Sequence, residues 1–379
     1  MRTPRFRSPA RAAAAALLGC ALAVLPCAAS DPPKPWYEQL TVNAFLSASY
    51  SYNFNRPESG LNRYRVFDFD DNTFKFDVAE IVLQKPVREP LDVGFRVDVA
   101  FGSSIPRVVA AADVGSGREG AQDYDVHQGF LTWIAPVGSG LKLDFGKFIT
   151  HHGYEVIEGY DGYDDNATRS FLFGYAIPFT HTGVRAAYAF SGKVSAMLMV
   201  VNGWDNGKDN NASKSVGAQA TLTPTASLTI YLNGMTGPER DGDDRHARTM
   251  LDLAATFKAS DRLSLGINFD RGSEEDAPVT EGLSRNASWG GGAVYAKVAV
   301  TPKLSLALRA EQFDDSDGFR TGTAQRLREI TLTPEYRASP HLVLRGDLRL
   351  DTSDAEVFEK DARAADRQAT ALFNAIVVF

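Results

Sequence analysis

The stretch Leu91-Asp-Val-Gly-Phe-Arg-Val-Asp-Val-Ala-Phe101 carries apolar side chains at its odd positions and Asp92, Arg96 and Asp98 at even ones. This period of two is typical of a β-strand that has one apolar face and one polar face. Arg or Lys facing the middle of a bilayer costs roughly 2–4 kcal/mol. The polar face must therefore meet water or other charges, and the stretch predicts a strand at the boundary between lipid and water.

The same alternation recurs along the chain, clearly in 263–270, 342–351 and 372–379, and always within segments of about ten residues. We predict sixteen strands near 40–54, 73–84, 91–101, 124–135, 141–150, 180–190, 193–204, 214–223, 227–237, 247–258, 262–272, 288–300, 303–313, 325–337, 341–352 and 366–379.

The connections between these strands alternate in length. Every second connection is short and rich in turn formers, as in 137–140, 191–192, 223–225 and 301–302, and the others are longer and polar. This alternation predicts an all-β fold, an antiparallel transmembrane β-barrel of about 16 strands with short periplasmic turns and long extracellular loops. A soluble β-sandwich would also alternate, but it has no reason to alternate loop lengths.

The N-terminal segment has the pattern of a secretory signal. Arg2, Arg5, Arg7 and Arg11 precede the apolar run 12–25, and small residues follow at 28–30. We predict a signal peptide over 1–30 and a barrel over 31–379. Both cysteines lie in this leader, so the remainder carries no disulfide. Residues 17–20 also resemble a lipoprotein cleavage box, which leaves open an acylated Cys20.

Charge and hydropathy exclude other classes of protein. Without the leader, Lys and Arg fall from 40 to 36 against 47 acids, which moves the net charge from −7 to −11. Such an acidic chain is a poor nucleic-acid binder. No later segment approaches the ~20 apolar residues of a membrane-spanning helix. Membrane crossing must therefore use a closed barrel.

A barrel of this size leaves an aqueous channel. The polar faces of the predicted strands then assign charged residues of both signs to the lumen. The predicted pore-lining residues are Arg96, Asp98, Lys142, Asp144, Arg185, Arg309, Glu311, Arg345, Asp347 and Arg349.

Several segments resemble the OmpL-like β-barrel porin family of outer-membrane proteins. The resemblance covers nearly the whole chain after the leader and is strongest over 49–211, including 49–57, 65–74, 94–102, 169–183 and 200–206. It implies a bacterial outer-membrane location and a channel shape more firmly than any solute. The terminal strand ending at Phe379 resembles the signal read by the barrel assembly machinery.

The connection 150–179 is the longest. In porins, the loop at this place folds into the barrel and narrows it, and the apolar run 171–179 would rarely be exposed. We expect this run to pack inside the barrel or against its rim, with the loop acids opposite the lumen arginines. The predicted constriction residues are His152, Glu155, Glu158, Asp161, Asp164 and Asp165.

Catalytic and metal sites have weaker support. His151-His152 lacks the spacing of a helical metal site, and the acids at 68–71 and 161–165 do not match an EF-hand, so we interpret them as solvated loop acids. Gly290-Gly291-Gly292 lacks a phosphate-loop Lys and is interpreted as a bend or bulge. We expect no enzyme activity, metal or cofactor, although a catalytic triad is defined in space and not in sequence.

The predicted function is passive diffusion of small hydrophilic solutes and ions. One alternative is an anion-specific channel in which Arg309, Arg345 and Arg349 bind the solute. Another is a barrel without transport, such as an adhesin or a membrane-embedded hydrolase. The expected partners are outer-membrane lipids and the assembly machinery, and the oligomeric state stays open, with a homotrimer as the common arrangement for porins of this size.

Overall fold

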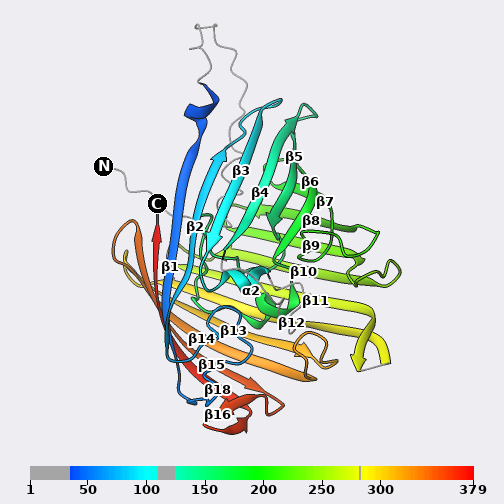
Figure 1. Ribbon diagram of the computed structural model, residues 1–379. Helices are drawn as coiled ribbons and strands as arrows, with labels where there is room; N and C mark the ends of the chain where they lie inside the picture. The colour runs from blue at the N-terminus through cyan, green and yellow to red at the C-terminus, as the bar shows by residue number, and fades with distance from the viewer. Residues whose placement is uncertain (1–34, 110–123, 281–282) are drawn as a thin grey trace.

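The computed structural model describes residues 35–109, 124–280 and 283–379. These residues form a closed barrel of sixteen antiparallel strands, with a separate two-stranded hairpin in one connection (Figure 1). The barrel strands are β1 (Thr41–Asn53), β2 (Thr73–Lys85), β3 (Val93–Phe101), β4 (Tyr124–Ala135), β5 (Leu141–Ile149), β6 (Thr180–Ala189), β7 (Val194–Val201), β8 (Ser215–Thr225), β9 (Leu228–Pro238), β10 (Ala247–Lys258), β11 (Leu263–Thr280), β12 (Leu283–Ala299), β13 (Leu304–Asp315), β14 (Gln325–Arg337), β15 (Leu342–Ser353) and β18 (Arg367–Val378).

Each strand pairs with its neighbour in sequence, and β18 closes the ring against β1. The closing register pairs Phe45 with Val378 and Asn53 with Thr370. Beyond the strand end, the Phe379 N–H donates to the Ala44 carbonyl at 2.9 Å. Closure leaves no unpaired strand edge, which a sheet in lipid cannot tolerate.

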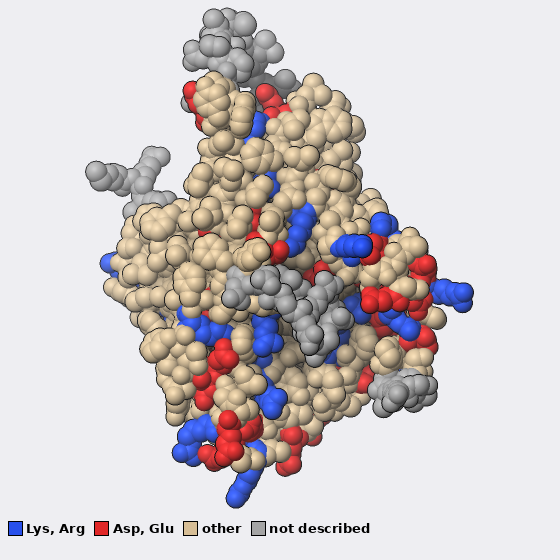
Figure 2. Space-filling model, viewed as in Figure 1, with Lys and Arg blue, Asp and Glu red and all other residues tan. Residues whose placement is uncertain are grey.

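The two faces of the wall differ as the alternation predicts. Large apolar side chains point outward, with Phe74 83%, Leu198 66% and Phe269 57% exposed. The intervening polar side chains point inward and are mostly buried; on β15 they are Arg345, Asp347, Arg349 and Asp351. Figure 2 shows mostly uncharged surface over the upper wall, with a few charged side chains, whereas charged side chains gather more densely toward the right and bottom. The all-β barrel prediction is therefore confirmed.

Three local predictions were wrong. Strands β11 and β12 extend over 273–280 and 283–287, which were expected to lie in a loop, and they pair as far as Thr280 and Leu283. A small hairpin, β16 (Phe358–Lys360) with β17 (Arg363–Ala365), forms in the connection before β18. The bulge considered at 290–292 is absent, because the pairing of β12 runs through these residues without a shift in register.

Two non-strand segments within the described ranges fold inward. The short helix α2 (Ile105–Val109) follows β3, and the π-helical turn η3 (Leu172–Ala176) lies in the connection between β5 and β6. Figure 1 shows both against the interior of the ring. A 3-10 turn, η1 (Trp36–Gln39), precedes β1. None of the helices in the described ranges is long and apolar enough to span a membrane. The predicted signal peptide and Cys20 lie outside the described residues.

Candidate functional site

The connection 150–179, here called the inner loop, contacts inward-facing side chains from widely separated parts of the wall. Near β2, the Tyr160 N–H donates to Glu80 at 2.7 Å. Across the ring, the Gly153 N–H donates to Asp252 of β10 at 3.1 Å. Because β2 and β10 are far apart in the strand order of a closed ring, the loop lies across the barrel interior.

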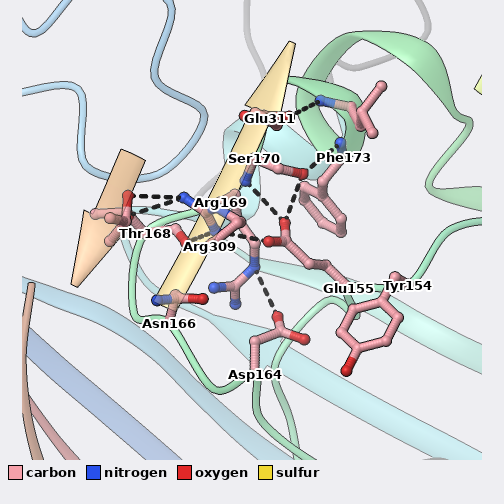
Figure 3. A network of polar contacts seen from close by, with 12 residues as sticks. Tyr154, Glu155, Asp164, Asn166, Thr168, Arg169, Ser170, Phe173, Arg309 and Glu311 are labelled. Atoms are coloured by element: carbon pink, nitrogen blue, oxygen red, sulfur yellow. Dashed lines mark hydrogen bonds and ion pairs between the residues drawn. The ribbon is translucent and has the colours of Figure 1, made fainter. Parts of the chain in front are cut away.

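A buried arginine of β13 fixes the middle of the inner loop (Figure 3). The Arg309 guanidinium lies 2.6 Å from Glu155 of the loop and 2.8 Å from Glu329 of β14. It also donates to the Thr168 carbonyl at 2.6 Å. Glu155 accepts two further bonds from the N–H and hydroxyl of Ser170. All the polar atoms of this pair are thus satisfied, as a buried charge requires.

A second arginine, Arg345 of β15, holds the acidic part of the loop. It lies 2.8 Å from Glu158 and donates to the Asp164 carbonyl at 2.6 Å. The loop supplies its own cation, since Arg169 lies 3.1 Å from the Asp164 carboxylate. Burial opposes ionisation of Glu158, but Arg169 and Arg345 together lower its pKa. Burial raises the pKa of Asp164 well above its ordinary range, and Arg169 only partly offsets this.

The apolar half of the inner loop packs inside the barrel, as expected from its sequence. Phe171 and Leu172 are fully buried and belong to one cluster with Trp289 and Phe313 of the wall. The N–H groups of Phe171 and Leu172 both donate to Glu311, at 2.5 and 3.1 Å. A carboxylate therefore accepts the free N–H groups where the turn η3 begins.

Inward-facing glycines give the loop room. A Cβ on Gly266 would lie 2.4 Å from the ring of Tyr154, and one on Gly291 would lie 3.0 Å from Leu172 and 2.1 Å from a neighbouring backbone oxygen. Within the glycine run 290–292, Gly291 therefore gives Leu172 of the loop room against the wall. This role depends on a partner more than a hundred positions away, so strand pattern could not reveal it.

The predicted pore-lining residues divide into two groups in the structure. Five of them, namely Arg309, Glu311, Arg345, Asp347 and Arg349, face inward but are buried beneath the inner loop. The others lie on β3, β5 and β6: Arg96, Asp98, Lys142, Asp144 and Arg185. In this second group Lys142 and Arg185 keep 44% and 21% of their side-chain surface exposed, and both lie close to Asp144. Only the second group therefore offers cationic side chains to solvent.

This division overturns one sequence hypothesis. The side chains of Arg309, Arg345 and Arg349 have no exposed surface, and carboxylates already pair with all three. They cannot bind a passing anion without displacing the loop. The acids of the loop do lie opposite arginines, as expected, but the charges are in contact, so they neutralise one another.

The predicted loop residues also differ in exposure. His152, Glu155, Glu158 and Asp164 are buried. Asp161 and Asp165 keep 47% and 30% of their side-chain surface exposed and pair with Arg96 at 2.8 Å and Lys297 at 2.9 Å. The prediction that the acids at 68–71 are solvated is wrong for Asp68, which is buried and lies 2.6 Å from Arg65. Arg65, which the sequence did not single out, also binds Asp351 at 2.6 Å.

Two cavities of about 390 Å³ flank the inner loop. One lies toward β2–β6 and is lined by Gln128, Thr132, Lys142, Asp161 and Arg185, among others. The other lies toward β8–β10 and is lined by the loop together with Gln219, Tyr231 and Thr256. Both of these cavities lie along the β2–β10 side of the wall.

Three histidines meet where the inner loop leaves β5. His151 and His152 are adjacent in sequence, and His181 comes from the start of β6. The sequence reading missed His181 because its partners lie across a hairpin with a long connection. Among the described residues, no hydrogen bond joins a serine hydroxyl to a histidine ring, so the geometry of a serine triad is not found there.

Comparison with known proteins agrees with the barrel. The porin of Comamonas acidovorans described as anion-selective has a TM-score of 0.59 at 9% identity, covering 90% of this chain and 99% of its own. OprB of Pseudomonas putida has a TM-score of 0.58 at 11% identity, covering 90% of this chain and 95% of its own. The trimer form of in-vitro folded OmpT of Vibrio cholerae has a TM-score of 0.53 at 12% identity, covering 90% of this chain and 99% of its own. At these identities the likeness shows the fold alone.

No curated protein matches the chain. The family described as "Putative beta-barrel porin-2, OmpL-like" matches residues 39–379, which is most of the sequence. Family and barrel together imply an outer-membrane location. The chain belongs to this OmpL-like β-barrel porin family.

Proposed function

We propose that this protein is a passive channel for small hydrophilic solutes and ions, narrowed by the inner loop. The observation that carries the proposal is the anchoring of that loop across the barrel. Buried ion pairs bind it to β13 and β15, and hydrogen bonds bind it to β2 and β10. A loop held from several sides narrows the lumen permanently and does not act as a mobile lid.

The solute path in this proposal follows the β2–β10 side, where the two cavities lie. The loop and its buried charges fill the β11–β15 side, and polar side chains such as Gln128, Thr132 and Gln219 line the remaining space. Such groups hydrogen-bond water and small polar solutes without holding them tightly. The path therefore favours diffusion over saturable binding.

The part of this path that lies toward β2–β6 favours anions weakly. Lys85, Arg96, Lys142 and Arg185 line the cavity toward β2–β6, whereas Asp161 is its one acidic lining residue among those described. Rings of cationic side chains select anions in pores. This supports the anion-preferring alternative at a different place from the arginines that the sequence suggested, and without a specific solute.

Single-channel recording in a planar bilayer tests the proposal. The wild-type protein should give stable conductance steps, and a variant in which a short Gly-Ser linker replaces 154–176 should give larger steps. A variant that shortens the β9–β10 connection at 241–244 is the matched control and should conduct like the wild type.

The outcomes separate the two parts of the proposal. If correctly folded wild-type protein gives no steps, the channel function is wrong and a barrel without transport is favoured. If the wild type and the 154–176 variant conduct equally, the loop does not set the constriction.

We also propose a homotrimer, because one structural neighbour is described in a trimer form. The detergent-corrected mass from light scattering should equal three chains. A mass of one chain over a wide concentration range would contradict this.

A further inference from the structure

The three histidines at the base of the inner loop form a compact cluster of nitrogen atoms. One ring nitrogen from each of His151, His152 and His181 lies within 4.8 Å of the others. The rings of His151 and His152 have centroids 4.2 Å apart, and each lies slightly more than 6 Å from that of His181. No carboxylate pairs with any of the three rings in the described structure.

The cluster contains nitrogen atoms that lack a partner. The Nε2 atoms of His151 and His152 are buried and make no hydrogen bond. A buried polar atom without a partner costs about 1–3 kcal/mol, so both nitrogen atoms would be stabilised by binding a ligand.

The surroundings orient His181 as a ligand. Its Nδ1 lies 3.2 Å from the Gly203 carbonyl, which can only accept, so Nδ1 carries the proton. Nε2 of His181 therefore presents its lone pair, toward Thr150 Oγ1 at 3.1 Å. A histidine that binds a metal commonly donates its other ring N–H to a backbone carbonyl in this way.

The rings also have no competing charged partner. His152 and His181 are buried and His151 is half-buried, and among the described residues no ion pair joins a carboxylate to any of the three. Neutral imidazole is the form that binds metals. The nearby cation, Arg185, forms an ion pair with Asp144 at 2.8 Å.

The cluster is open to the lumen on one side. His151 and His152 line the 390 Å³ cavity toward β8–β10. At ~30 Å³ per water, that volume holds on the order of ten waters, enough for a hydrated ion to enter.

We propose that His151, His152 and His181 bind one divalent transition-metal ion of the zinc, copper or nickel class. Three imidazoles suit these ions, and a fourth position facing the cavity stays open for water. Metal–nitrogen bonds of ~2.0–2.1 Å place tetrahedral ligands ~3.3 Å apart. Side-chain rotations that bring the nitrogens closer by about 1–1.5 Å complete the site.

Metal binding to the refolded, tag-free full barrel tests the site directly. Equilibrium dialysis against Zn²⁺ or Ni²⁺ with elemental analysis should give one ion per chain. Loss of an outer-shell partner of a ligating histidine costs roughly 10–100-fold in affinity. His152→Ala and His181→Ala should weaken binding at least as much, and His246→Ala is the matched control that should not. Equal binding by all four proteins would overturn the proposal.

A second measurement does not depend on losing the site. Residues 31–379 contain no cysteine, so His152→Cys places a single thiol in the cluster. With Co²⁺ it should give the near-ultraviolet thiolate-to-metal band, and His246→Cys should not. Identical Co²⁺ spectra from the two folded variants would show that the histidines do not form a metal site.

Discussion

At the scale of single residues, the interior of the barrel is organised by buried arginines that form ion pairs with carboxylates. Arg309 has no exposed side-chain surface, yet both Glu155 and Glu329 contact it. Removing one partner of such a pair is far more costly than removing an exposed one, because the remaining charge stays buried. The inner loop is therefore bound to the wall by the cost of leaving these charges unpaired.

Glu155→Gln tests this anchoring. The substitution keeps the shape of the side chain but removes the charge opposite Arg309, so the free energy of unfolding should fall by about 3 kcal/mol. Urea unfolding of the refolded barrel measures the change. The control is Lys258→Gln, which breaks an exposed pair with Asp261 and should cost less than about 1 kcal/mol. Equal losses of unfolding free energy in Glu155→Gln and Lys258→Gln would mean that the buried pair does not anchor the loop.

Lys142→Glu tests the proposed path. Lys142 is the most exposed of the predicted pore-lining cations that form ion pairs. Reversing its charge should shift the reversal potential in a salt gradient toward cations. Lys303→Glu, in the exposed turn between β12 and β13, is the control and should leave the potential unchanged. An unaltered potential in Lys142→Glu would place the path elsewhere.

At the scale of elements, neighbouring connections stabilise one another. The connection between β7 and β8 supplies Asp205, whose carboxylate accepts from the N–H groups of Phe179 and Thr180 at 2.5 and 2.7 Å. This acid therefore fixes the point where the inner loop enters β6. Burial raises the pKa of Asp205 to about 6.

The raised pKa gives a pH dependence with a definite sign. The folded protein holds the Asp205 proton up to about pH 6, whereas the unfolded chain loses it near the ordinary aspartate pKa of 3.8. The contribution of Asp205 to stability is therefore complete below pH 3.8 and is lost as the pH rises through 6, by about 3 kcal/mol.

Asp205→Asn should remove this dependence while keeping an acceptor for both N–H groups. Relative to the wild type, the variant should unfold at similar urea at pH 4 and at higher urea at pH 8. Asp354→Asn, at an exposed aspartate, should not reproduce the difference. A constant offset between wild type and Asp205→Asn at both pH values would contradict the argument.

At the scale of the whole molecule, closure of the ring depends on the last residues. The Phe379 ring is 61% exposed at the rim and stacks on His341 with centroids 5.2 Å apart. Its backbone exchanges two hydrogen bonds with Ala44. The terminal residue thus joins β18 to β1 through its backbone, while its ring lies at the surface against His341.

Phe379→Ala separates assembly from stability. The backbone bonds to Ala44 remain, so refolding in detergent should change little, while the amount of barrel assembled in the outer membrane of living cells should fall strongly. Heat-modifiable gel mobility measures both. Phe373→Ala, at an outward-facing residue of the same strand, is the control. Normal assembly of Phe379→Ala in cells would remove its proposed role as an assembly signal.

Sequence periodicity located the barrel strands because each strand in a bilayer must present one face to lipid and one to water. This demand ends beyond the membrane. The polar extensions of β11 and β12 and the hairpin β16–β17 were not predicted. They have no lipid-facing side, so their sequences do not alternate between apolar and polar residues.

By itself, the sequence predicted an antiparallel barrel of about sixteen strands and the inward direction of its charged residues, because alternation between neighbouring positions marks each strand and its two faces. Only the tertiary structure decided which of those charges are covered. Arg309 meets Glu155 across 154 positions, and His181 joins His151 and His152 across the whole inner loop. Such pairings depend on how one long connection packs inside a closed ring, and local periodicity carries no information about them.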